Sequence, residues 1–251
     1  MEILIRNHPI PRDVDVTALL GSLSVLKQHP DYLQAKAGSP EHALQLVSDL
    51  ALAEIYQFRA DFPPGCIFVA PHAREVTGDN AIPQTLAEVY ALVCGGKPDR
   101  SVHQISKVYH TGADAMQRLL HPPKFAGNVV AGAQYVLVDD VTNIGSTLAE
   151  LANYIQAFGG LVFDMAVLVN DGREKSIHPR TTLLNTVKER FAHETVELFG
   201  AEPDALTANE VKYIAGFRHA DDLRGRAGKA QQARDIRLRS KGLLDGPETQ
   251  A

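Results

Sequence analysis

The chain of 251 residues has an ordinary globular composition, with 45% hydrophobic and 22% charged residues and a formal net charge of −5 at pH 7. It contains two cysteines, which argues against a disulfide framework and against a cysteine-ligated zinc site. No apolar run approaches the length needed to cross a bilayer and the N-terminus lacks a signal-peptide pattern, so we expect a cytoplasmic protein without a membrane partner.

The N-terminal region contains a predicted helix that begins at Ser39-Pro40-Glu41. Serine is a favoured N-cap, and proline is favoured at the first helical position. We therefore expect residues 1–60 to form an N-terminal helical extension, followed by a core at residues 61–200.

The core alternates strand-like and helix-like segments. This alternation is typical of an α/β fold in which a central, mostly parallel sheet carries helices on both faces. The pattern predicts strands at residues 66–70, 102–108, 135–139, 161–169 and 195–199. It predicts helices at residues 83–93, 114–120, 148–158 and 181–191.

The C-terminal region, residues 201–251, is predicted to be a basic helical extension with a disordered end. Residues 209–241 carry nine Lys or Arg side chains against four Asp or Glu side chains, so this segment is basic in an otherwise acidic chain. A solvated helical face with internal ion pairs is the favoured explanation. A surface for nucleic acid or polyphosphate is the alternative, and nucleic acid is not the favoured partner.

Two adjacent acids, Asp139 and Asp140, end the third predicted strand, and a short loop and a helix follow them. In a parallel sheet, ligands bind beyond the carboxyl ends of the strands. Two neighbouring carboxylates remain charged only beside donors or a cation, such as vicinal sugar hydroxyls or magnesium. The loop at residues 142–147 offers backbone amides at a helix N-terminus and a flexible Gly145, which suit a phosphate group. A plain strand-to-helix turn is the alternative.

The segment Val136-Leu-Val-Asp-Asp-Val-Thr-Asn-Ile-Gly-Ser-Thr147 resembles the phosphoribosyl diphosphate (PRPP) signature of the type I phosphoribosyltransferases. The resemblance implies that Asp139 and Asp140 hold the ribose hydroxyls of PRPP, directly or through Mg²⁺, and act as catalytic and metal-binding residues. It implies that the following loop binds the 5-phosphate through Thr142, Asn143, Ile144, Gly145, Ser146 and Thr147.

The resemblance also implies two segments that contact pyrophosphate. In the loop after the first core strand, Arg74 is the first candidate and a further catalytic residue, and His72 is the second candidate. A surface pair of Arg74 with a neighbouring acid is the alternative. A mobile loop is expected before the signature, where Lys107, His110 and Arg118 are candidates and Lys107 is counted as catalytic.

Two positions depart from the family pattern. Members that act on 6-oxopurines often carry an acid where this chain has Asn143, and asparagine cannot serve as an acid or base. A purine-salvage mechanism of that kind is therefore in doubt. Ile144 replaces the usual small hydroxyl residue, which removes one side-chain donor from the loop.

The implied function is that of a magnesium-dependent phosphoribosyltransferase of nucleotide metabolism. It would transfer the ribose 5-phosphate group of PRPP to a nitrogenous small-molecule acceptor and release pyrophosphate, with the chain ends forming a hood and the protein a homodimer. The sequence does not identify the acceptor. The alternative is a PRPP-binding regulatory or nucleic-acid-associated protein without transferase activity. An unrelated phosphatase-like site built on the two acids is a third, poorer hypothesis.

Overall fold

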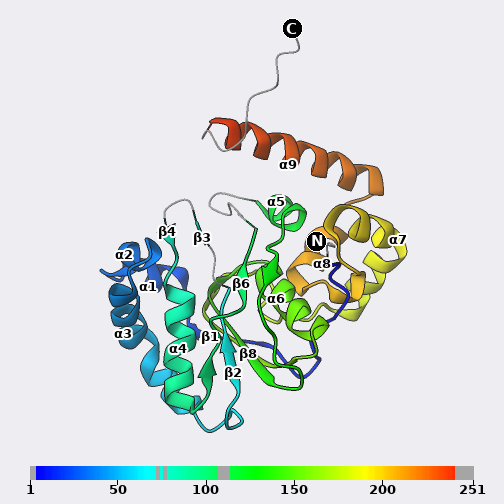
Figure 1. The fold of residues 1–251 in the computed structure, drawn as a ribbon. Helices are drawn as coiled ribbons and strands as arrows, with labels where there is room; N and C mark the ends of the chain where they lie inside the picture. Colours follow the sequence, from blue (N-terminus) through cyan, green and yellow to red (C-terminus); the bar gives the residue numbers. More distant parts are fainter. Residues whose placement is uncertain (1–3, 72–73, 76–77, 107–113, 241–251) are drawn as a thin grey trace.

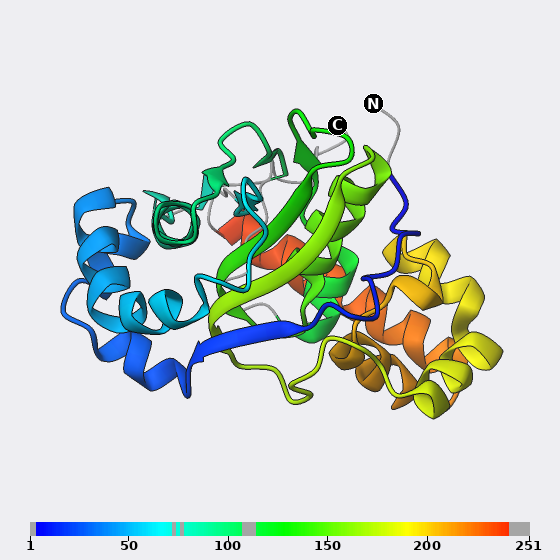
Figure 2. The same cartoon turned by 90° about the horizontal axis from the view of Figure 1, so that it is seen from below.

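A five-stranded parallel sheet forms the centre of the molecule (Figures 1 and 2). The computed structural model describes residues 4–71, 74–75, 78–106 and 114–240. The strand order across the sheet is β1 (Val16–Leu20), β9 (Leu161–Asn170), β8 (Gln134–Thr142), β2 (Ile67–Val69) and β5 (Lys97–Pro98). The predicted α/β fold with a parallel sheet and helices on both faces is confirmed.

Helices cover both faces of this sheet and extend beyond one of its edges (Figure 1). One face carries α1 (Leu23–Gln28), α2 (Tyr32–Lys36), α3 (Pro40–Phe58) and α4 (Ile82–Cys94), and the opposite face carries α6 (Ser146–Ala157). A separate helical layer consists of α5 (Ala115–Leu120), α7 (Thr181–Phe199), the 3₁₀ turn η1 (Pro203–Ala205), α8 (Ala208–Ala215) and α9 (Ala220–Ser240). None of the described helices is long and apolar enough to cross a membrane.

Three expectations about strands need correction. The segment 195–199 is not a strand but the last turns of α7, which runs from Thr181 to Phe199. The segment that begins at residue 102 does not join the central sheet: β6 (His103–Gln104) pairs with β7 (Phe125–Ala126) in a small antiparallel ladder. Finally, β1 lies in the N-terminal region that was expected to be a helical extension, and it pairs with β9.

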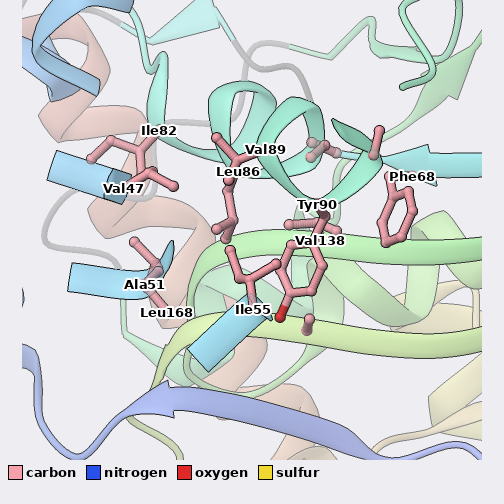
Figure 3. Packing of buried hydrophobic residues seen from close by; sticks show 14 of the residues in the cluster. Val47, Ala51, Ile55, Phe68, Ile82, Leu86, Val89, Tyr90, Val138 and Leu168 are labelled. Carbon is pink, nitrogen blue, oxygen red and sulfur yellow. The ribbon is translucent and has the colours of Figure 1, made fainter. Parts of the chain in front are cut away.

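The largest apolar cluster lies between the sheet and the α3–α4 layer (Figure 3). Its contacts bring Val47, Ala51 and Ile55 of α3 and Leu86 of α4 against Val138 of β8. The rings of Phe68 and Tyr90 stack with their centroids 5.5 Å apart. Burial of these side chains fixes β8, and hence the acids near its carboxyl end, against a rigid layer.

A third apolar cluster holds the helical layer together and includes one residue of the predicted phosphate loop. Val187 and Phe191 of α7 and Val211 of α8 are fully buried in it. Ile144, which follows β8, packs into the same cluster. The helical layer is therefore attached to the sheet through the loop at residues 142–147.

Candidate active site

The carboxyl ends of β2 and β8 lie side by side where the strand order reverses. From β2 the chain passes through α4 to β5 at one edge, whereas from β8 it passes through α6 to β9 in the opposite direction. In open parallel sheets such a reversal leaves a crevice beyond the strand ends, and ligands bind there. The predicted pyrophosphate and phosphate loops follow these two strands.

The two acids of the signature have different surroundings. β8 extends to Thr142, so Asp139 and Asp140 lie inside the strand and their side chains point to opposite faces of the sheet. Asp139 lines a cleft formed with the loop at residues 142–147, which we call the phosphate loop. Asp140 accepts hydrogen bonds from Lys36 Nζ and Asn80 Nδ2, each 3.0 Å from its Oδ2. The sequence did not reveal this division of roles.

The groups around Asp139 act on the pKa of its carboxyl group in opposite directions. Burial raises the pKa of Asp139 well above its usual range, and the neighbouring charge of Asp140 raises it further. The backbone N–H of Asp140, which donates to Asp139 Oδ1 at 2.8 Å, and the Lys36 ammonium act in the opposite direction. A hydroxyl donor or a cation in the cleft would favour the ionised carboxylate in the same way.

Of the two acids, Asp139 is the one whose carboxylate faces the cleft and can meet a magnesium ion there. Within the described residues, no three His, Cys, Asp or Glu side chains gather into a metal site. Mg²⁺ keeps several waters and is commonly held by one or two carboxylates together with substrate phosphates. Asp139 in the cleft can supply one such carboxylate, while Asp140 already receives the Lys36 ammonium.

Asn80 couples the start of α4 to Asp140, which gives a first prediction. Its Nδ2 donates to Asp140 and its Oδ1 accepts from the backbone N–H of Ile82 at 3.2 Å.

Asn80→Asp keeps the acceptor but replaces the donor with a like charge. We expect the free energy of unfolding at pH 7 to fall by about 1–3 kcal/mol, as for a buried group that loses its partner. The loss should shrink at acidic pH, where a carboxyl becomes protonated. Urea denaturation at both pH values measures it, and unchanged stability at pH 7 would contradict the coupling.

The phosphate loop has the geometry of an anion-binding turn. Gly145, between β8 and α6, has a φ of 83° and is the N-cap of α6 without a side-chain cap. The backbone angle therefore favours glycine, and a Cβ atom at this position would lie 2.7 Å from Ile177 Cδ1, so that side chain would have to shift. The first amides of α6 are therefore free of a capping side chain and can bind an anion.

Residues at the N-terminus of α8 form hydrogen bonds with the phosphate loop at Ile144 and Ser146. Thr207 Oγ1 donates to the carbonyl oxygen of Ile144 at 2.5 Å, and Ser146 Oγ donates to Glu210 Oε1 at 2.5 Å. Thr207 and Glu210 also form the capping box of α8. We call this set of contacts the α8 clamp. The Ser146 hydroxyl, predicted as a phosphate donor, is thus used to anchor the loop.

A buried arginine near the N-terminus completes the α8 clamp. Arg6 Nη2 donates to both carboxylate oxygens of Glu210 at 3.0 Å, and Glu210 is fully buried. Arg6 Nε also lies 3.4 Å from Glu150 Oε1. Burial nevertheless raises the pKa of Glu150 to about 7, because the desolvation of its carboxylate outweighs the attraction of Arg6. Sequence reasoning missed Arg6 and Glu210, although Thr207 and Glu210 have the spacing of a capping box.

One of the residues predicted to bind pyrophosphate, Arg118, lies beside the phosphate loop. Arg118, on α5, lines the cleft together with Asp139 and the phosphate loop. Burial lowers its pKa, while the charge of Asp171 opposes that change. Arg74 lies in β3 (Arg74–Glu75), which pairs with β4 (Gly78–Asp79), and the position of its side chain is not described. His72, Lys107 and His110 lie outside the described residues.

Comparison with curated proteins finds partial relatives. The chain is 32% identical to Protein TraN of Escherichia coli over 219 residues, which cover 84% of this chain and 48% of TraN. It is 37% identical over 131 residues to an uncharacterized protein of Haemophilus influenzae, covering 51% of this chain and 29% of that protein. The chain thus spans about half the length, or less, of these relatives. No family model matches the sequence.

Solved structures with a similar arrangement include several phosphoribosyltransferases. Adenine phosphoribosyltransferase of Thermoanaerobacter pseudethanolicus is 19% identical with a TM-score of 0.34, over 52% of this chain and 73% of that chain. The Leishmania donovani enzyme of the same name is 15% identical with a TM-score of 0.35, over 78% and 79% of the two chains. Leishmania donovani UMP synthase is 14% identical with a TM-score of 0.31, over 74% and 35%. At such low TM-scores, the fold assignment rests on the sheet and its connections.

Proposed function

We propose that this protein is a magnesium-dependent phosphoribosyltransferase. It transfers the ribose 5-phosphate group of PRPP to a nitrogenous acceptor and releases pyrophosphate. The observation that carries this proposal is the cleft in which Asp139, the uncapped amides of the phosphate loop and the Arg118 guanidinium meet. A carboxylate suits sugar hydroxyls, and amides with a guanidinium suit a phosphate, so the cleft matches a phosphorylated sugar.

The spacing along the chain supports PRPP over other sugar phosphates. Asp139 and Gly145 come from the two ends of one strand-to-helix connection, so a single rigid unit can hold the hydroxyls and the 5-phosphate. The segment after β2 begins at the strand end beside β8, where we place a pyrophosphate group on the anomeric carbon. Arg74, His72, Lys107 and His110 are the residues we propose for that group. We propose Arg118 for the 5-phosphate because it lines the same cleft as the phosphate loop.

The reaction is a displacement at the anomeric carbon. The nitrogen lone pair of the acceptor forms the new bond as the bond from carbon to pyrophosphate oxygen breaks, and positive charge develops on the ribose ring. Asp139, once ionised, holds the hydroxyls and stabilises that charge, while the phosphate loop fixes the other end of the sugar. Asp139 would hold Mg²⁺ through sugar hydroxyls and waters, and the ion would supply charge neutralisation for the departing pyrophosphate, while Asp140 stays bound to Lys36 and Asn80.

The proposal is tested by measuring PRPP binding in the presence of MgCl₂. We expect Asp139→Asn combined with Asp140→Asn to weaken binding by about tenfold to a hundredfold, since the charged hydrogen bond lost at Asp139 is worth about 1.5–3 kcal/mol. Isothermal titration calorimetry measures the affinity, and thermal denaturation shows whether the variant remains folded.

Asp164→Asn is the matched control for this double variant. Asp164 lies on the neighbouring strand β9, opposite Val136 in the register and away from the cleft. The control variant should bind PRPP as the wild type does. Absence of magnesium-dependent PRPP binding by the wild type, or a thermal shift by PRPP that persists in the double variant, would refute the proposal.

A further inference from the structure

A larger cavity opens beside the phosphate loop, on the side of the helical layer. It measures about 610 Å³ and shares Asn143 and Ile144 with the cleft that holds Asp139. Its other walls come from α5, from the segment after β9 and from α8, and its polar lining residues there are Asp171, Arg173, Asn209, Lys212 and Tyr213. Pockets for small organic ligands have volumes of about 300–1,000 Å³, so the cavity has room for a nitrogenous ring.

Its position suits a second substrate of the proposed reaction. The cavity and the cleft adjoin at the phosphate loop, where Asn143 lines both spaces. α5 and α8 contact each other in the helical layer, on the side of the phosphate loop where the cavity lies (Figure 1). A ligand in the cavity would therefore approach the sugar from the side of the phosphate loop rather than from the segment after β2.

The charges in the cavity leave an excess of positive charge. Lys212 Nζ donates to Glu174, and Asp171 lies close enough to Arg118 for their charges to interact. The structure describes no ion pair for Arg173 with any residue in the parts of the chain that it covers, and this side chain is exposed. Arg173 is thus a cation in the cavity wall whose charge is not balanced by a described partner. A guanidinium in that situation favours a carboxylate or phosphate ligand.

Asn143 and Tyr213 favour a flat ring whose nitrogen can attack without a side chain that removes its proton. The amide of Asn143 can orient a ring nitrogen but cannot remove a proton from it. The Tyr213 ring offers an aromatic wall, and it is held edge-to-face by Phe217 with the centroids 5.5 Å apart. The Asn209 amide already bonds the backbone of Glu174, which fixes the segment that carries Arg173.

We propose that this cavity binds the acceptor and that the acceptor is an acidic nitrogenous ring, whose anionic group pairs with Arg173. This inference rests on the proposed phosphoribosyl transfer. The ring nitrogen forms the bond to the anomeric carbon, and the electron pair of the broken carbon–oxygen bond leaves with pyrophosphate. A proton carried by the attacking nitrogen passes to water.

The test uses ring acids that are each matched with a neutral counterpart, such as orotate with uracil and nicotinate with nicotinamide. Pyrophosphate release is measured with PRPP and MgCl₂, and binding of each ring is measured by calorimetry with and without PRPP. We expect turnover and binding with at least one acid and not with its neutral counterpart. Turnover with neutral rings alone, or binding of no acid in the panel, overturns the acidic acceptor.

Two variants tie the result to this cavity. Arg173→Gln is expected to raise the KM for the acid by about tenfold, through loss of a charge-assisted hydrogen bond, while kcat and the affinity for PRPP stay unchanged. Arg180→Gln is the matched control, because Arg180 is also exposed and lies near Glu174 but does not line the cavity. Equal KM values for the wild type and Arg173→Gln overturn the inference. If the wild type shows no magnesium-dependent binding of PRPP, the proposed transferase itself is refuted.

Discussion

Arg6→Ala is expected to lower the free energy of unfolding by about 3–5 kcal/mol, which is typical of a buried ion pair that loses one partner. Glu210 has no exposed surface, and Arg6 Nη2 donates to both of its carboxylate oxygens. Without the guanidinium, a desolvated carboxylate remains beside Glu150, whose carboxylate is itself largely desolvated. Urea denaturation followed by circular dichroism measures the change.

The control variants separate charge from packing. Arg6→Met with Glu210→Gln removes both charges and keeps most of the volume, so it should recover a large part of the lost stability. Arg12→Ala removes an exposed arginine six positions further along the chain and should change stability by less than about 0.5 kcal/mol. If Arg6→Ala costs no more than Arg12→Ala, then the buried pair does not stabilise the fold.

Gly145→Ala is expected to impair both stability and anion binding. At a φ of 83° an alanine costs about 1–3 kcal/mol in backbone strain, and its Cβ would lie 2.7 Å from Ile177 Cδ1. Relief of the backbone strain shifts the loop, and its amides then lose their alignment with the ligand. Loss of a charged hydrogen bond of about 1.5–3 kcal/mol corresponds to PRPP affinity weakened about tenfold or more. Calorimetry and thermal denaturation measure the two effects.

Gly200→Ala provides the matched comparison for backbone strain. Gly200 ends α7 with a φ of 62°, and a Cβ there would meet no atom within 4 Å. Its substitution carries the same kind of strain without the clash and lies outside the cleft. We expect Gly200→Ala to lose stability and keep PRPP affinity. Equal affinities for PRPP in the wild type and Gly145→Ala would contradict the role of the phosphate loop.

Local sequence patterns predicted the elements that carry the cleft. The apolar run before Asp139 and the glycine-containing turn after it are adjacent in sequence, so β8, the phosphate loop and α6 could all be predicted. The strand β1 could not, because Val16–Leu20 is an edge strand whose residues are partly exposed and show no clear alternation. Period-2 and period-3.6 patterns need longer or more regular segments than this.

Where the local pattern predicted the wrong structure, contacts with residues further along the chain determine the observed one. Residues 195–199 are rich in strand-forming side chains, but Val187, Phe191 and Thr195 are buried at four-residue intervals and continue the apolar face of α7. The pairing of Arg6 with Glu210 joins positions 204 residues apart, which no local pattern can reveal. For the same reason the sequence showed Ser146 only as a phosphate donor, whereas its hydroxyl bonds Glu210.

The α8 clamp also has a consequence for the order in which the protein folds. The phosphate loop follows β8, but the groups that hold it, Thr207 and Glu210, are synthesised more than sixty residues later. The strands of the central sheet all end by Asn170, so they leave the ribosome before Thr207 and Glu210 do. We therefore expect a nascent chain to complete the central sheet before the cleft can retain a ligand. Competence to bind would be acquired in one of the last steps of folding.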